Sequence, residues 1–158
     1  MTLEEKLKAG FGKCQFYSEE EKALYGSKNF NCCEKICKGA NRVYNLGLDE
    51  NAEHITAAFG GGMGIETVCG AVTGSLMAIS LKCCDSIEKN TNLKQEYAIP
   101  FLKKVEAEMG SIYCHDLKPQ YFGEDPTCYC DGAIMGVAKI LDETMMEIEK
   151  KQKETAEE

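Results

Sequence analysis

One stretch of the chain, Phe59 to Cys84, restricts the fold more than any other. It reads FGGGMGIETVCGAVTGSLMAISLKCC, and the part from Val68 to Leu81 carries no charge. This run is shorter than the roughly 20 apolar residues that cross a membrane, so we expect a buried helix over 68–82. The glycines before it adopt positive φ without steric cost, which predicts a tight turn at the entrance of this helix.

The rest of the chain follows a helical pattern. No long stretch alternates apolar and polar residues, and the chain has only three prolines. We expect further helices at 3–12, at 31–45 with a cap at Gly47, from Asp49 or Asn51 to the glycine run, at about 97–109, and from an N-cap at Asp131. Loops are expected at 83–95 and 110–129, and the tail at 150–158 is expected to fray. The sequence thus predicts one all-α domain over 1–158, a bundle of about five to six helices.

Small residues recur every four positions along the central helix. Gly70, Gly74 and Ala78 share one face, with Ala71 and Ser75 beside them. Each interior glycine costs roughly 1 kcal/mol relative to alanine, so close approach by another helix or by a cofactor is the expected compensation. The same face makes a homodimer a candidate arrangement.

The net charge of the chain and its first residues indicate which partners and which cellular compartment to expect. The chain has 18 Lys and Arg against 26 Asp and Glu, a net charge of −8, and no basic stripe. Nucleic-acid binding is therefore not expected, because it depends on clustered cations. The first residues, MTLEEKLKAGFGKC, contain no apolar signal segment. We expect a cytoplasmic protein that does not enter the membrane.

The chain contains ten cysteines. Cytoplasmic thiols stay reduced, so this number favours metal binding or redox chemistry over a disulfide framework. For any one cysteine a buried, inert thiol is the common alternative. Ten such thiols together would be unusual.

Five motifs carry a resemblance to a known family: FNCC at 30–33, FGGGMG at 59–64, VCGAVTGSLMAISL at 68–81, GSIYCHDL at 110–117 and CDGAIMGVAKIL at 130–141. They resemble the family of redox-active proteins named for its C-GCAxxG-C-C cysteine pattern, which also supplies a domain of the split-Soret cytochromes. The likeness covers about residues 28–145. It implies a small helical protein that holds an iron–sulfur cluster or redox-active cysteines.

Carried over by position, the family's cysteines correspond to Cys32, Cys69, Cys114 and Cys130. Around Cys69 the order is Cys-Gly-Ala, so the cysteine that the family's name places after the glycine is absent. The chain also contains no C-x-x-C-H, which excludes covalent haem of the cytochrome kind.

Four thiolates are the usual ligands of a [2Fe–2S] or [4Fe–4S] cluster. The spacings of these four cysteines match no compact ferredoxin motif, so the ligand set depends on the resemblance. Backbone amides of the glycine-rich segment can donate to cluster sulfurs, which predicts cofactor contacts at Gly60, Gly61, Gly62, Gly64 and Gly70. A second metal centre could draw on the neighbouring cysteines Cys33, Cys37, Cys83, Cys84 and Cys128. His115, next to Cys114, could bind iron or donate a hydrogen bond to a cluster sulfur, and a solvated side chain is the common alternative.

Three functions stay open from sequence. The first is an iron–sulfur protein that transfers electrons or senses redox state with a basic partner protein. The second is a metal-free thiol–disulfide protein, and the third is a protein in which zinc only stabilises the fold. No arrangement of substrate-handling residues is visible, so a redox protein is expected rather than a stand-alone enzyme.

Overall fold

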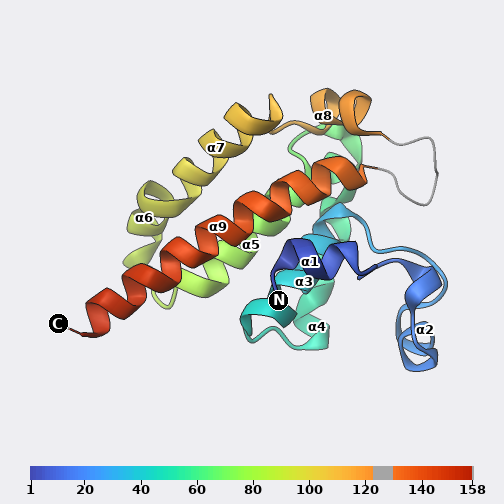
Figure 1. Cartoon of the computed structure of the whole chain (residues 1–158), viewed down its shortest axis with the longest axis horizontal. Coiled ribbons are helices and arrows are strands. Elements are labelled where there is room, and N and C mark those ends of the chain that lie inside the picture. Colours follow the sequence, from blue (N-terminus) through green and yellow to red (C-terminus); the bar gives the residue numbers. More distant parts are fainter. Residues whose placement is uncertain (123–129, 158) are drawn as a thin grey trace.

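The computed structural model describes residues 1–122 and 130–157 (Figure 1), and Cys128 lies outside these ranges. Its helices are α1 Leu3–Lys8, α2 Glu19–Tyr25, α3 Cys32–Tyr44, α4 Glu50–Glu53, α5 Gly70–Cys83, α6 Lys89–Leu93, α7 Ile99–Met109, α8 Cys114–Tyr121 and α9 Asp131–Ala156. Extended pairing within the described ranges is limited to one antiparallel bridge between Val68 and Tyr113. The predicted all-α class is confirmed.

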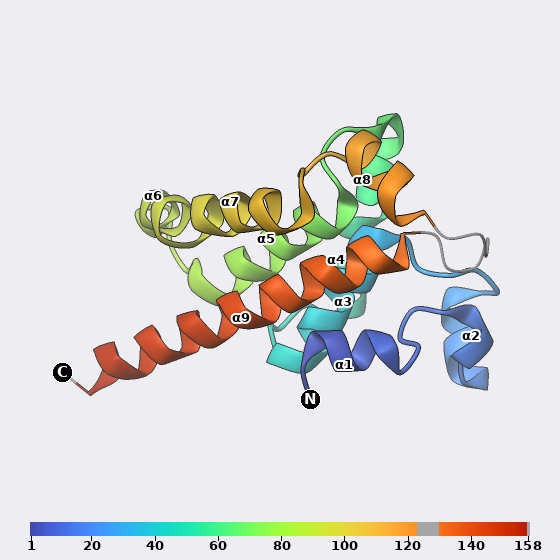
Figure 2. The same cartoon turned by 45° about the horizontal axis from the view of Figure 1, so that its top comes forward.

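Helix α5 lies in the centre of the bundle, packed against α3 and α9. Helices α1 and α3 lie on one side of α9, and α7 lies on the other (Figure 2). The small-residue face of α5 is covered by α3: a Cβ atom on Gly74 would lie 2.8 Å from the carbonyl oxygen of Cys33. The expectation that another helix packs closely on this face is confirmed. Helix α3 of the same chain occupies this face, and the homodimer stays a prediction.

Several helix starts follow from side-chain caps. Thr2 and Glu5 form a capping box at α1, as do Ser18 and Glu21 at α2. Asn31 and Glu34 form another at α3. The predicted helix over 31–45 is observed with almost the same bounds. It ends at Tyr44, and its cap is Asn45 in the left-handed conformation, not Gly47.

Other expectations were wrong. Helix α2 was not expected, α6 lies in the predicted loop 83–95, and α8 lies in the predicted loop 110–129. The first helix ends at Lys8, and the third is only the short α4, followed by one tighter 3₁₀ segment. Asp131 is the first residue of α9, not its N-cap, which is Cys130.

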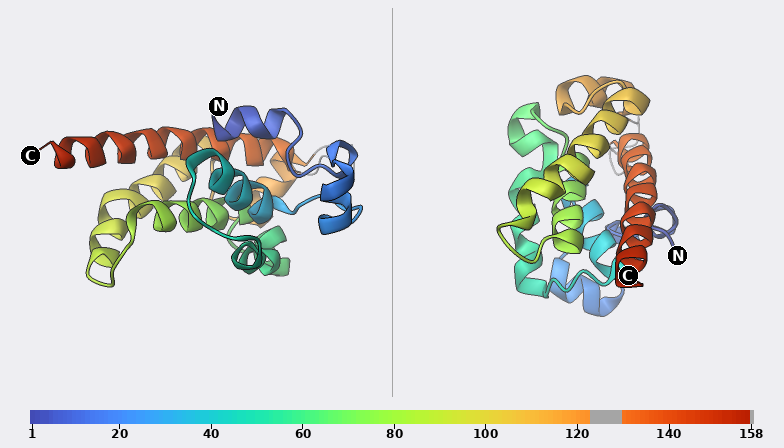
Figure 3. Two further views of the ribbon diagram at one scale, coloured as in Figure 1. Left: turned by 90° about the horizontal axis from the view of Figure 1, so that it is seen from below. Right: turned by 90° about the vertical axis from the view of Figure 1, so that its left-hand side faces the viewer.

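The charged tail is helical rather than frayed. Helix α9 continues to Ala156 and extends beyond the rest of the bundle (Figure 3). The Gln152 side chain donates to the carbonyl of Lys82 at 3.2 Å, and Lys150 pairs with Glu154 one turn later. Contact with the end of α5 and pairing along the helix thus replace the missing apolar residues. None of the described helices combines the length and the apolarity needed to cross a membrane.

Candidate metal centre

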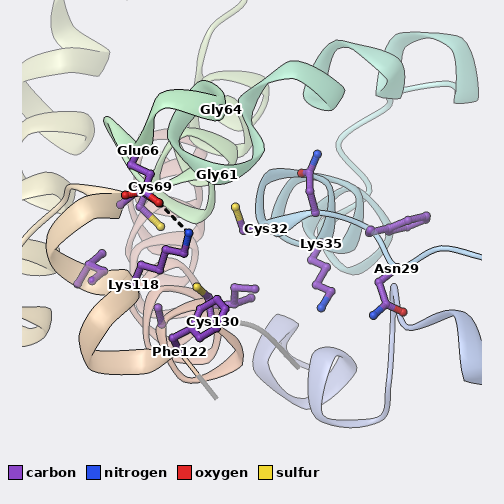
Figure 4. Close-up of a pocket in the computed structure, with 16 residues that line it drawn as sticks. Asn29, Cys32, Lys35, Gly61, Gly64, Glu66, Cys69, Lys118, Phe122 and Cys130 are labelled. Carbon is purple, nitrogen blue, oxygen red and sulfur yellow. Dashed lines mark hydrogen bonds and ion pairs between the residues drawn. The ribbon is translucent and has the colours of Figure 1, made fainter. Parts of the chain in front are cut away.

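Four cysteines mark the starts of four helices. Cys32 and Cys114 are the first residues of α3 and α8, and Cys69 and Cys130 are the N-caps of α5 and α9. All four line one cavity of about 450 Å³. In Figure 4 the sulfur atoms of Cys32, Cys69 and Cys130 border a common gap. The structure thus brings together the four cysteines that the resemblance selects.

Backbone pairing places Cys69 beside Cys114. The Cys69 amide donates to the Ile112 carbonyl at 2.9 Å, and the Cys114 amide donates to the Thr67 carbonyl at 2.6 Å. These bonds flank the bridge between Val68 and Tyr113. The entrances of α5 and α8 are therefore fixed to each other before either helix begins.

The glycine run forms a left-handed turn in front of this pairing. Gly61, Gly62, Met63 and Gly64 all have φ between 59° and 76°. The Thr67 amide and hydroxyl both donate to the Gly62 carbonyl, at 3.1 and 2.9 Å. A Cβ atom on Gly62 would lie 2.5 Å from the Thr67 nitrogen and 2.8 Å from the Cys114 Cβ. A residue with a side chain at position 62 would therefore separate the turn from Cys114.

Gly70 has the same relation to Cys32. A Cβ atom at position 70 would overlap the Cys32 sulfur and lie 2.8 Å from the Phe59 carbonyl oxygen. Position 70 thus has no space for a cysteine while Cys32 keeps its place. The glycine that follows Cys69 is therefore suited to this contact between α5 and the start of α3.

The five glycines predicted to contact a cofactor lie in different places. Gly61 and Gly64 line the cavity directly. Gly62 and Gly70 press against Cys114 and Cys32, and Gly60 lies against the Asn31 side chain. Hydrogen bonds from their amides to a cluster stay a prediction.

Burial raises the pKa of three of these thiols. It raises the pKa of Cys69 to about 12, with a further contribution from the charge of Cys32 and an opposing one from the amides of Ala71 and Val72. The pKa values of Cys114 and Cys130 are raised by burial first and by the charge of Cys32 second. The negative charge of a Cys32 thiolate thus disfavours ionisation of Cys69, Cys114 and Cys130, and a bound cation would offset this repulsion.

A comparison with family models agrees with this arrangement. The model described as "Putative redox-active protein (C_GCAxxG_C_C)" matches residues 30–144, which include all four cysteines of the cavity. The chain belongs to this family. The resemblance drawn from the motifs is therefore confirmed, and so is a redox role in general terms. No curated protein and no solved structure matches the chain.

Charged side chains that sequence reasoning missed also line the cavity of this redox-active protein. Lys118 pairs with Glu66 at 2.7 Å, and both side chains are partly exposed. Lys35 lies one turn after Cys32, and its ammonium lies 3.4 Å from Asp131. The spacing between Cys32 and Lys35 is the sequence signal that could have indicated this position, because residues three apart share a helix face.

The cysteines proposed for a second centre lie in two places. Cys33 and Cys37 are buried in α3, where Cys33 contacts Thr73 and Met77 of α5, each at 3.9 Å. Cys83 and Cys84 lie at the other end of α5, where the Cys84 thiol donates to Asn90 at 2.6 Å. Cys128 lies outside the described residues.

His115 is not among the residues that line the cavity. Its ring stacks on Tyr113 at 5.4 Å, and its Nδ1 lies 2.9 Å from the carbonyl oxygen of Glu66. In the described part of the chain, no three Cys, His, Asp or Glu side chains lie close enough together to share a single metal ion.

Proposed function

We propose that this protein is an iron–sulfur protein in which Cys32, Cys69, Cys114 and Cys130 hold a [4Fe–4S] or [2Fe–2S] cluster. It transfers electrons to or from a partner protein, or reports redox state to it. The observation that carries the proposal is the convergence of four helix starts, each with one cysteine, on one cavity.

The donor set fits such a group. Four thiolates are the usual ligands of both cluster types, with one thiolate on each iron of a [4Fe–4S] cluster. A single Zn²⁺ instead needs all its sulfur ligands about 2.3 Å from one point. The four cysteines line a cavity of about 450 Å³, which leaves room between them for a polynuclear cluster.

Electrostatics also support an anionic group at this position. Helix N-termini carry a partial positive charge that stabilises thiolates and other anions. Lys35 and Lys118 add cationic groups in a chain whose net charge is −8. When bound, the cluster supplies one-electron transfer. The chain itself keeps the four sulfurs partly or fully buried and provides an acidic surface that suits a basic partner.

The test is metal analysis of protein purified without oxygen. We expect about two to four irons with matching acid-labile sulfide per chain, and a brown protein with sulfur-to-iron absorption bands. Serine in place of each of the four cysteines should lower iron content strongly. Cys14→Ser is the matched control, because Cys14 is partly exposed like Cys32 and Cys130 but lies outside the cavity and in neither candidate metal centre.

Other outcomes would contradict the proposal in different ways. Stoichiometric zinc without iron would indicate a structural metal. No metal, together with a reversible change in the number of free thiols, would indicate thiol–disulfide chemistry. Unchanged iron in Cys69→Ser would remove Cys69 from the ligand set.

A further inference from the structure

We infer that Lys35 is a tuning residue, whose buried ammonium raises the reduction potential of the group bound at the four cysteines. This inference rests on the proposed function. It assigns a task to a side chain that is not a ligand and that the cysteine pattern does not include.

Lys35 lies where its charge acts on the site. It lies on α3 one turn after Cys32, and it lines the same cavity as the four cysteines. Figure 4 shows it projecting from α3 across the gap from Cys69. Its side chain is 6% exposed, so water screens its charge weakly.

The surroundings hold this side chain in place. Gly12 has φ +78°, and a Cβ atom there would lie 2.9 Å from the Lys35 Cγ. The Lys35 stem therefore occupies space that a side chain at position 12 would fill. At its end, Asp131 accepts from the Lys35 ammonium at 3.4 Å and pairs with Lys13 at 2.7 Å.

Burying the Lys35 ammonium costs free energy, which calls for a functional reason. Taking an ammonium out of water carries a large free-energy penalty, and a buried ion pair often fails to repay it. The carboxylate of Asp131 is shared between the Lys35 and Lys13 ammonium groups, at 3.4 and 2.7 Å, so it is not a dedicated partner of Lys35. An anionic group at the cysteines would give the Lys35 ammonium, which lines the same cavity, a second anionic neighbour.

Lys118 provides a contrast within the same cavity. Its side chain is 43% exposed and pairs with Glu66 at 2.7 Å, so the pair is neutral and screened by water. Removing Lys118 should therefore change the potential less than removing Lys35.

The direction of each effect follows from the charge change on reduction. Reduction adds an electron, so a nearby cation stabilises the reduced form and a nearby carboxylate destabilises it. Lys35→Met should lower the potential, and Asp131→Asn should raise it. The double variant should lie between the two.

The experiment is an equilibrium redox titration of loaded protein, followed by absorption and electron paramagnetic resonance. It uses the wild type, Lys35→Met, Asp131→Asn, the double variant, and Lys118→Met as the control. Iron and sulfide content are measured for each, with urea unfolding as a separate readout of stability. A merely structural role would lower the stability of both single variants without shifting their potentials in opposite directions.

The outcomes are distinguishable. Wild-type protein without iron overturns the proposed function itself. Loaded protein in which Lys35→Met leaves the potential unchanged or raises it overturns the assignment of Lys35 alone. If Lys35→Met binds no iron, two other variants are compared with the wild type. We expect a higher potential in Asp131→Asn and a near-native potential in Lys35→Arg. The absence of both effects overturns the assignment of Lys35.

Discussion

Replacing Gly70 with alanine tests whether close packing around the sulfurs shapes this site. The added Cβ would overlap the Cys32 sulfur and lie 2.8 Å from the Phe59 carbonyl oxygen and 3.2 Å from the Cys33 nitrogen. Two of these three neighbours are backbone atoms, which cannot rotate away. Helices α3 and α5 must therefore move apart, or Cys32 must turn away from the cavity.

The magnitude combines two opposing effects. Overpacking a dense core costs about 1–3 kcal/mol. Replacing a helical glycine with alanine returns at most about 1 kcal/mol. The net loss in free energy of unfolding should be about 1–2 kcal/mol, which lowers Tm by about 2–8 °C for a chain of this length.

The assay is urea unfolding of metal-free protein, together with iron content after loading. Gly136→Ala is the matched control: its added Cβ would also meet a neighbour at 2.5 Å, but that neighbour is the sulfur of Met109, at the flexible end of its side chain. The control should be as stable as the wild type or slightly more stable, with full iron content. Gly70→Ala with wild-type stability and wild-type iron would refute the reasoning.

Three further predictions concern stability. Asp142→Ala should lower the free energy of unfolding by about 2 kcal/mol, because the Asp142 carboxylate accepts from the Leu3 and Glu4 amides at 2.8 and 3.0 Å and so caps the start of α1. Asp142→Asn should lower it less in the same urea assay. Glu53→Gln should lower the free energy of unfolding by about 3 kcal/mol in a thermal unfolding assay, because Glu53 is 2% exposed and pairs with Arg42. A loss below about 1 kcal/mol would contradict a buried ion pair at this position. Stability of the metal-free protein should fall as pH rises from about 9 towards 12, because burial raises the pKa of Cys69 from its usual 9.0 to about 12 in the folded protein. The neutral Cys69 thiol contributes its full stabilisation below the pKa of the unfolded chain, and this contribution is lost as pH rises towards the folded pKa. Equal urea midpoints at about pH 8 and 10 would contradict this prediction.

The helices with strong local signals could be predicted from sequence. Helix α3 follows from the Asn31 and Glu34 capping box, and α5 follows from its uncharged apolar run. Helix α8 could not be predicted, because it buries only Cys114 and Leu117 and contains Pro119. Its packing against α9 and the segment Gly62–Glu66 stabilises it, and those contacts lie far away in sequence.

The site was predictable only in part. The four cysteines came from the family likeness, since nothing in their spacing requires them to meet. Their convergence depends on how α3, α5, α8 and α9 pack, and this is a property of the whole bundle. The burial of Lys35 could not be predicted from sequence, because a lysine on an amphipathic helix is normally solvated. The Lys35 stem lies against Gly12, which is distant in sequence and has no side chain.

The glycines and the cysteines are connected through packing between segments. Gly70 gives room to Cys32, and Gly62 gives room to Cys114, so each glycine marks the approach of a cysteine from another helix. The backbone freedom lost before Cys69 is thereby compensated by close contact around the sulfurs. Because the four cysteines begin four different helices, any group bound to all of them also joins α3, α5, α8 and α9. Stability of the bundle and occupancy of the site should therefore depend on each other.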